Sequence, residues 1–293
     1  MSKQSKEYPK RGFVTLGINT DQDNIRYCYG LACSIKSCDP NASVTLIVDK
    51  DKTGNVQSYY EHAFDYIVEL PHGNSAHKDG FHGMNLWQIY HCTPYEETIY
   101  VDYDTIFSNV DVDTLWDILS NGDISIPSDA MNYRNLRIDY SKRFEFEVQY
   151  RLPKLFNNLI YFHKNSVLAE QWFKMADPVF QNWRDVYSHL FTDKKPETFN
   201  KNILANVVTH FLDMEIQVST RLNNLYDLHL NSHGVFLNPD EIPQNWTDSL
   251  NYWVTDAGRV QIENSVIGGG IIHYSDELFL TDEVLDVFRT KVT

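Results

Sequence analysis

The sequence is poor in several features that mark common classes of protein. Only 4 of its 293 residues are cysteines, and their spacing matches no C-x2-C zinc site. We therefore expect free thiols in a reducing compartment rather than a disulfide framework. No stretch reaches the roughly 18 apolar residues that a membrane span needs, and residues 1–7 lack the apolar run of a signal peptide. These absences predict a soluble, cytoplasmic protein.

Positive charge is also scarce, since 25 Lys and Arg residues stand against 40 Asp and Glu residues, a net charge of -15. A surface this acidic repels phosphate backbones, which disfavours a dedicated duplex-binding protein. The glycine-rich phosphate motifs G-x-G-x-x-G and G-x-x-x-x-G-K-[ST] are missing as well. Dinucleotide-binding and P-loop interpretations therefore lose their main support.

What the sequence does contain is an alternation of apolar strand-like runs with helical segments. The strands are expected at 12–19, 44–49, 66–70 and 98–107, and the helices between them at 23–36, 56–64 and 84–91. Later strands are expected at 123–127, 155–162, 234–239 and 268–274, and later helices at 111–119, 166–175, 197–210 and 282–288. This pattern predicts one α/β domain over residues 1–293, built on a doubly wound, mostly parallel sheet.

The most informative stretch is the apolar run 98–101, which leads directly into Asp102 and Asp104. On a strand, side chains at i and i+2 leave the same face, roughly 6.6 Å apart. Carboxylates that close repel each other unless a cation lies between them. A hard divalent ion, Mn²⁺ or Mg²⁺, that keeps open positions for phosphate oxygens satisfies this pair. A solvated turn after a strand is the simpler alternative.

Two other polar residues, Asn19 and Asp49, also follow predicted strands. In open α/β sheets, ligands bind beyond the carboxyl ends of the strands. We therefore expect Asn19 and Asp49 to lie at the same sheet edge as the carboxylate pair.

The segment 132–154 differs from the rest because basic residues are interleaved with aromatic ones. Tyr133, Arg134 and Arg137 begin this cluster and are candidates for binding an acceptor. Such a cluster can hold a sugar ring, a phosphorylated acceptor or a splayed base. The alternative is an amphipathic segment whose aromatic rings pack inward.

Several short motifs occur in a familiar order along the chain. They are Val14-Thr15-Leu16-Gly17, Val48-Asp49, Ile99-Tyr100-Val101-Asp102-Tyr103-Asp104 followed by Leu115-Trp116, Phe156-Asn157-Asn158-Leu159-Ile160, and Ile271-Ile272-His273-Tyr274. This order resembles GT-A-fold glycosyltransferases, and most closely family 8, the glycogenin and bacterial galactosyltransferase type. The resemblance implies a GT-A-like fold with an acceptor-side subregion. Residues 1–130 would then form the nucleotide-sugar half, and residues 131–293 the acceptor half with a C-terminal metal-site segment.

The resemblance also implies roles for individual residues. Asp102 and Asp104 would hold Mn²⁺ or Mg²⁺ on the donor diphosphate, and His273 would be the third protein ligand. The remaining roles are donor contacts for Thr15, Asn19 and Asp49, and catalytic positions beside the transferred sugar for Asn157, Asn158 and Glu197.

The chain also departs from the family pattern. Leu159 replaces a glycine, and the family's H-x-x-G-x-x-K-P-W ending does not follow His273, so its diphosphate-binding lysine is missing there. Lys78 is the nearest candidate for the basic donor-binding residue expected before the D-x-D strand.

The function these features predict is metal-dependent glycosyl transfer. The donor would be a nucleoside diphosphate sugar, a UDP-sugar first of all, and the acceptor a hydroxyl group of a saccharide or a protein. The resemblance to retaining families implies that the anomeric configuration is kept. Three alternatives stay open: a hydroxylated nucleobase in DNA as acceptor (viral DNA hypermodification), a non-catalytic sugar-nucleotide or glycan-binding protein, and a D-x-D phosphatase or nucleotidyltransferase.

Overall fold

The computed structural model describes residues 8–18, 24–49, 56, 58–74, 82–138, 152–190, 198–228, 252–262, 264–274 and 279–292. The strand expected at 234–239 lies outside these residues, as do Asn19, Lys78 and Glu197. Within the described part, no helix combines the length and the apolar character that crossing a membrane would require.

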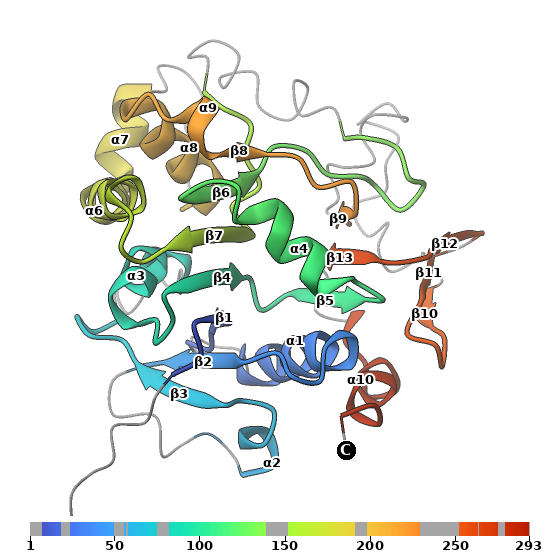
Figure 1. The fold of residues 1–293 in the computed structure, drawn as a ribbon. Helices are drawn as coiled ribbons and strands as arrows, with labels where there is room; N and C mark the ends of the chain where they lie inside the picture. Colours follow the sequence, from blue (N-terminus) through green and yellow to red (C-terminus); the bar gives the residue numbers. More distant parts are fainter. Residues whose placement is uncertain are drawn as a thin grey trace, which may run out of the picture.

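A seven-stranded sheet in the order β3-β2-β1-β4-β7-β6-β8 forms the centre of the fold (Figure 1). Its strands are β1 (Arg11–Leu16), β2 (Val44–Val48), β3 (Tyr66–Glu69), β4 (Glu97–Val101), β6 (Ile124–Pro127), β7 (Leu159–His163) and β8 (Ser219–Thr220). The strands β3, β2, β1 and β4 are mutually parallel, whereas β7 runs antiparallel to both β4 and β6. The predicted doubly wound, mostly parallel sheet is therefore confirmed.

Both faces of this sheet are covered, so its central strands are apolar on both sides. In β1, Phe13 belongs to one hydrophobic cluster and Val14 to the other, and in β4 the same holds for Ile99 and Tyr100. Successive side chains of a strand point to opposite faces, which explains why these strands read as continuous apolar runs.

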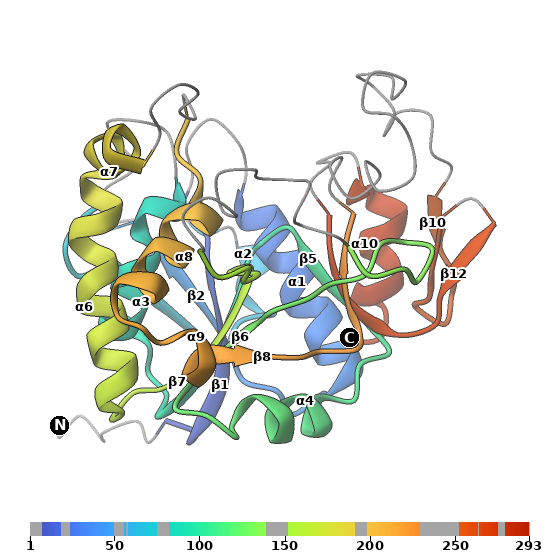
Figure 2. The ribbon, with the colours of Figure 1, turned by 90° about the horizontal axis from the view of Figure 1, so that it is seen from above.

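Helices supply the second layer on each face (Figure 2). One cluster includes residues of α1 (Asn24–Cys38), α4 (Val112–Leu119) and α10 (Asp282–Arg289). The other includes residues of α6 (Val167–Gln181), α7 (Trp183–Leu190) and α8 (Lys201–Phe211). The remaining short helices are α2 (Ser58–Glu61), α3 (Ile89–Cys92) and α9 (Glu215–Val218).

Two of the expected helices differ from their prediction. The helix expected at 56–64 contains only the four residues of α2. The helix expected at 84–91 is a 3-10 helix, η3 (His82–Gln88), followed by α3. Residues 84–89 are all buried, so this segment has no solvent-facing side on which a regular amphipathic helix depends. The amide side chains of Asn85 and Gln88 form hydrogen bonds there, such as the 2.8 Å bond from Gln88 Nε2 to the Gly73 carbonyl.

Two smaller sheets flank the large one. The first has the order β5-β13-β9 and consists of β5 (Thr105–Ser108), β13 (Gly270–His273) and β9 (Leu225–Asp227). The second, which the sequence did not predict, consists of β10 (Tyr252–Val254), β11 (Val260–Ile262) and β12 (Ser265–Ile267). The first sheet brings β13 beside β5, which follows β4 in the chain (Figure 1), and this pairing positions the candidate site.

Candidate donor and metal site

Asp102 and Asp104 lie in a tight connection between two strands rather than on a strand. β4 ends at Val101, and the backbone N–H of Asp102 donates a 2.9 Å hydrogen bond to the Asn158 carbonyl. Tyr103 turns away and its ring lies 5.9 Å from that of Tyr27. The spacing expected from strand geometry therefore does not apply, but the turn still directs both carboxylates to one place, at the carboxyl end of β4.

Strand register brings a histidine to the same place. His273 pairs with Thr105 across the antiparallel β5–β13 ladder and with Asp227 across the parallel β13–β9 ladder. A side chain at Gly270 would prevent this, because a Cβ there would lie 2.6 Å from the Asn224 carbonyl oxygen. The pairing of segments far apart in the sequence thus places His273 beside the D-x-D turn.

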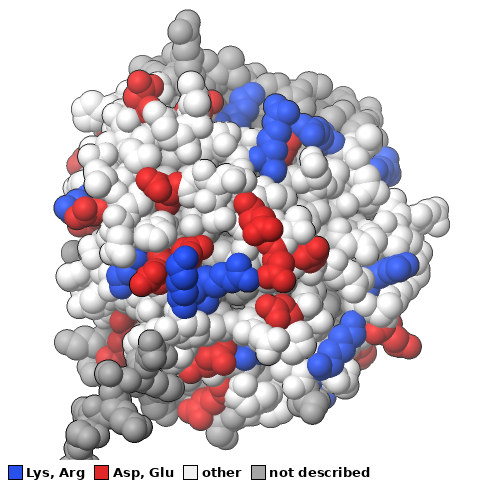
Figure 3. Space-filling model, in the orientation of Figure 1, with Lys and Arg blue, Asp and Glu red and all other residues white. Residues whose placement is uncertain are grey.

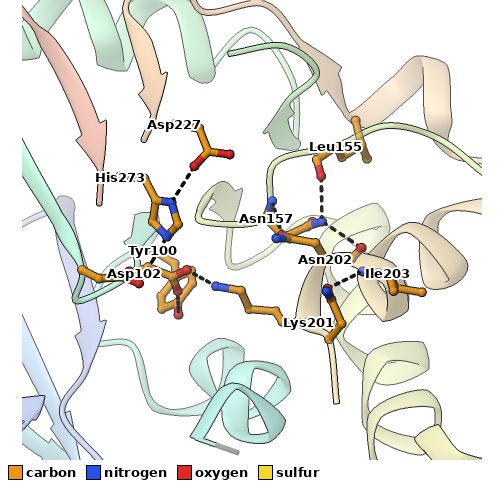
Figure 4. A network of polar contacts seen from close by, with 11 residues as sticks. Tyr100, Asp102, Leu155, Asn157, Lys201, Asn202, Ile203, Asp227 and His273 are labelled. Atoms are coloured by element: carbon orange, nitrogen blue, oxygen red, sulfur yellow. Dashed lines mark hydrogen bonds and ion pairs between the residues drawn. The ribbon is translucent and has the colours of Figure 1, made fainter. Parts of the chain in front are cut away.

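The imidazole of His273 bridges two carboxylates (Figure 4). Its Nε2 lies 3.2 Å from Asp104 Oδ2, and its Nδ1 lies 3.1 Å from Asp227 Oδ1. Burial by itself lowers the pKa of His273, but Asp104 and Asp227 together outweigh it and raise that pKa to about 10. The ring is therefore an imidazolium at neutral pH when no metal ion is bound.

Asp102, Asp104 and His273 fit a divalent metal ion. One ligand atom from each lies within 4.8 Å of the others. Metal-binding histidines usually bond through their second ring nitrogen to a carboxylate, which fixes the tautomer. Asp227 stands in that position on His273 Nδ1, leaving Nε2 for the ion. Two carboxylates and one imidazole suit Mn²⁺ or a similar ion.

Lys201 is a site residue that the sequence analysis missed. Its ammonium group contacts Asp102 Oδ2, while the Tyr100 hydroxyl donates a hydrogen bond to Oδ1 of the same carboxylate (Figure 4). Lys201 is the first residue of α8, and Asn200 caps that helix through a 3.2 Å bond from Ile203 N–H to Asn200 Oδ1. A lysine at a helix N-terminus faces the positive end of the helix dipole. From the sequence, the helix was expected to begin at residue 197, which placed Lys201 away from its start.

Asn157 and Asn158 lie in the segment that leads into β7, and their described contacts are with the framework. The Asn158 carbonyl holds Asp102, and the Asn157 N–H donates a 3.1 Å bond to Asn202 Oδ1. The Asn157 amide nitrogen donates to the Leu155 carbonyl at 3.3 Å. The Asn157 side-chain oxygen is buried and has no hydrogen-bond partner among the described residues. Contact between these amides and a sugar stays a prediction.

The other expected donor residues are placed as follows. Thr15 is buried near the carboxyl end of β1, with its hydroxyl 3.8 Å from Cys28 Sγ of α1. Asp49 directly follows β2 and is buried. Asn19, Lys78 and Glu197 lie outside the described residues, so their roles stay predictions.

The predicted acceptor segment 132–154 is described at residues 132–138 and 152–154. Tyr133 is buried, and the Arg134 guanidinium lies 5.2 Å from the centre of its ring. Arg137 forms a 2.7 Å ion pair with Asp129 and is more than half exposed. The aromatic ring packs inward, as the simpler alternative expected, while the two arginines lie outside it.

Comparison with solved structures identifies the architecture as the GT-A glycosyltransferase fold, as the resemblance implied. The galactosyltransferase LgtC in complex with donor and acceptor sugar analogues has a TM-score of 0.53 and 12% identity, covering 96% of this chain and 95% of that chain. An active-site mutant of LgtC has a TM-score of 0.50 and 9% identity, covering 96% of this chain and 94% of that chain.

Mouse xyloside xylosyltransferase 1 covers 91% of this chain and 98% of its own at 9% identity, but its TM-score of 0.48 is too low to establish a shared fold. No protein-family model and no curated protein matches the sequence. At such low identities, the likeness to LgtC shows the fold alone.

Proposed function

We propose that the protein is a metal-dependent glycosyltransferase that moves a sugar from a nucleoside diphosphate sugar to a hydroxyl acceptor. The observation that supports this most is the group formed by Asp102, Asp104 and His273. It lies at the carboxyl end of β4, where open α/β sheets bind their ligands. The GT-A fold, shared with a galactosyltransferase whose structure contains donor and acceptor analogues, supports the same activity.

The protein groups around the site prepare it for an ion and a diphosphate. Asp227 holds His273 so that Nε2 faces Asp104, and Tyr100 together with the Asn158 carbonyl fixes Asp102. A bound divalent ion acts as a Lewis acid that neutralises the charge developing on a departing diphosphate. We propose Mn²⁺ before Mg²⁺, because an imidazole ligand suits Mn²⁺ better than the oxygen-seeking Mg²⁺.

The donor and the stereochemistry follow from the resemblance. We propose a UDP-sugar as donor and transfer with retention of configuration. Residues 1–130 would form most of the nucleotide-sugar half, and residues 131–293 would contribute the acceptor side. His273 and Lys201 come from the second half and lie against Asp104 and Asp102 of the first, so both halves are needed for the metal site.

The acceptor would approach from the side of Tyr133, Arg134 and Arg137. On the face shown in Figure 3, basic and acidic side chains of the described residues are interspersed and form no continuous basic surface. A long nucleic-acid acceptor needs such a surface, so we favour a saccharide or protein hydroxyl over a nucleobase in DNA.

A thermal-shift titration tests the proposed function. UDP, GDP and ADP are added separately, with and without Mn²⁺ or Mg²⁺, to the wild-type chain. A ligand at 100 times its dissociation constant stabilises the folded state by about 2.7 kcal/mol. We expect UDP to raise the melting temperature only when metal is present. Failure of every nucleoside diphosphate to do so in the presence of metal would contradict the proposal.

Product analysis separates glycosyl transfer from the alternatives. With a UDP-sugar and Mn²⁺, slow hydrolysis that releases UDP is expected of a glycosyltransferase. A nucleotidyltransferase would release or consume pyrophosphate, a phosphatase would release phosphate, and a binding protein would release nothing.

The acceptor side has its own test. Replacing Arg134 and Arg137 together by Ala should leave hydrolysis of the donor unchanged and weaken transfer to an acceptor. Arg184→Ala is the matched control, because Arg184 also lies over an aromatic ring, that of Trp183, at 4.3 Å. Equal loss of hydrolysis and transfer in the double variant would exclude an acceptor role.

A further inference from the structure

A cationic side chain of the protein itself, that of Lys201, already contacts one of the proposed metal ligands, Asp102. The Lys201 ammonium contacts Asp102 Oδ2, and the Tyr100 hydroxyl is bonded to Oδ1. Both oxygens of Asp102 are therefore engaged by protein groups. The side chains of Lys201 and Asp102 are only 15% and 7% exposed, so this is a largely buried ion pair.

Lys201 occupies an unfavourable position except for this contact. It begins α8, where the helix dipole repels a cation. Burial of an ammonium is costly unless a counter-charge is close. Its stem lies beside Gly83 of η3, where a Cβ would come within 3.5 Å of Lys201 Cβ, and its ammonium lies 5.8 Å from the centre of the Tyr100 ring. The geometry directs the charge at Asp102.

We propose that Lys201 is a resident counter-ion that competes with the divalent metal for Asp102. We further propose that Lys201 transfers its contact to a phosphate oxygen of the donor once the metal is bound. The second step rests on the proposed function, whereas the competition depends only on metal binding by Asp102, Asp104 and His273.

The competition follows from charge. A divalent ion bound by Asp102 would share that carboxylate with Lys201 and Tyr100, and it would repel the ammonium held there. A lysine suits the exchange because it is a compact point charge on a flexible four-carbon stem. A diphosphate bound to the ion would place anionic oxygens beside these side chains. Such oxygens can accept hydrogen bonds from the displaced Lys201 ammonium.

The arrangement couples two ligands. Metal alone must displace Lys201 without compensation and should bind weakly. Metal together with a nucleoside diphosphate offers the ammonium a new partner and should bind tightly. By linkage, the nucleotide strengthens metal binding by the same factor as the metal strengthens nucleotide binding. Lys201 would thereby suppress occupation of the site by metal without donor.

The test is the affinity for Mn²⁺, measured from the electron paramagnetic resonance signal of free Mn²⁺, with and without UDP. The variants are Lys201→Met, which keeps the stem and removes the charge, and Lys174→Met as control. Lys174 is exposed and pairs with Glu170 on the same helix. Lys201→Gln provides a second neutral variant should the methionine variant be insoluble.

We expect Lys201→Met to bind Mn²⁺ about tenfold more tightly than wild type in the absence of nucleotide, a factor within the usual range for coupled sites. In the presence of saturating Mn²⁺ it should bind UDP about tenfold more weakly. Lys174→Met should match wild type in both titrations.

Unchanged or weaker Mn²⁺ binding by Lys201→Met without nucleotide would overturn the counter-ion role. Tighter Mn²⁺ binding combined with unchanged UDP binding would overturn the transfer of Lys201 to phosphate. If none of the three proteins binds a nucleoside diphosphate, the proposed function fails. The titration with Mn²⁺ alone still decides the counter-ion role in that case.

Discussion

The two sides of the candidate site are built by different physical means. The carboxylate side consists of Asp104, His273 and Asp227, which the β5-β13-β9 sheet brings together by strand register. The amide side consists of Asn157, Asn202 and Lys201, which lie where the segment leading into β7 meets the first turn of α8. Asp102 lies between the two sides.

Because the two sides are built differently, we expect one of them to govern ion binding and the other to govern the stability of the fold. On the carboxylate side the contacts are between charged groups, and a bound metal ion would take the place of the proton between His273 Nε2 and Asp104. On the amide side most contacts are neutral hydrogen bonds that hold β7 against α8, and Lys201 is the one charged member. Substitutions on the carboxylate side should therefore change ion affinity, and those in the amide framework should change stability.

The largest effect is expected for Asp104→Asn, which removes a charged ligand of the ion. Outer partners of metal ligands are typically worth about 10- to 100-fold in affinity, so loss of a ligand should weaken Mn²⁺ binding by at least about 100-fold. Asp113→Asn is the matched control, because Asp113 is exposed and pairs with exposed Arg11 at 2.8 Å. Equal Mn²⁺ affinity in Asp104→Asn and Asp113→Asn would show that Asp104 is not a ligand of the ion.

The next largest effect is expected for Asp227→Asn. Asp227 does not belong to the ligand group but orients His273 through Nδ1. We expect Mn²⁺ affinity to fall by about 10- to 100-fold, measured by the same titration. An affinity equal to that of wild type would show that the His273 tautomer is fixed by other means. Asp227 would then have no part in ion binding.

A pH effect should be visible in the metal-free protein. Asp104 and Asp227 raise the folded-state pKa of His273 to about 10, above the unfolded value of about 6.5. The imidazolium therefore stabilises the fold fully below about pH 6.5, and this contribution is lost as the pH rises through about 10. These two pKa values correspond to roughly 4 kcal/mol of stability at neutral pH.

Urea denaturation of wild type and His273→Gln between pH 6 and pH 10 measures this contribution. The difference in unfolding free energy between the two proteins should shrink as the pH rises. A difference that is constant or grows with pH would contradict the charge state assigned to His273.

The smallest effect is expected on the amide side, for Asn200→Ala. Asn200 caps α8 through its bond from Ile203 N–H, and loss of a helix cap typically costs about 1 kcal/mol. Thermal unfolding should show this loss while Mn²⁺ affinity stays within about twofold of wild type. A change in ion affinity comparable to that of Asp227→Asn would show that the framework and the ion site are not separable.

The strands of the large sheet other than β8 (Ser219–Thr220) were predictable because their apolar runs are continuous. A strand covered on both faces needs no alternation, and β1, β2 and β4 show this in the sequence. The edge at which Asp49, Asp102 and Asp104 lie follows from the rule for open sheets. The exact geometry of the D-x-D turn did not follow, because nothing local distinguishes the end of a strand at Val101 from its continuation to Phe107.

Other features depend on contacts between distant segments. Asp227 meets His273 only because β9 and β13 pair in parallel with one particular register, and three-residue strands such as β9 to β12 contain too little periodicity to be recognised. His273 was assigned through the family resemblance rather than through its surroundings. The helix expected at 197–210 placed Lys201 in its second turn, whereas α8 begins at Lys201 itself. Its partner, Asp102, lies 99 positions earlier.

The central claim is that Asp102, Asp104 and His273 bind a divalent ion that in turn holds the donor diphosphate. Anomalous diffraction from crystals grown with Mn²⁺ and UDP tests it most directly. The prediction is one anomalous peak at about 2.0–2.6 Å from an oxygen of each aspartate, a range typical of hard cations, and in contact with His273 Nε2 and the UDP phosphates. UDP bound with no manganese at these residues, or manganese bound elsewhere, would contradict the claim.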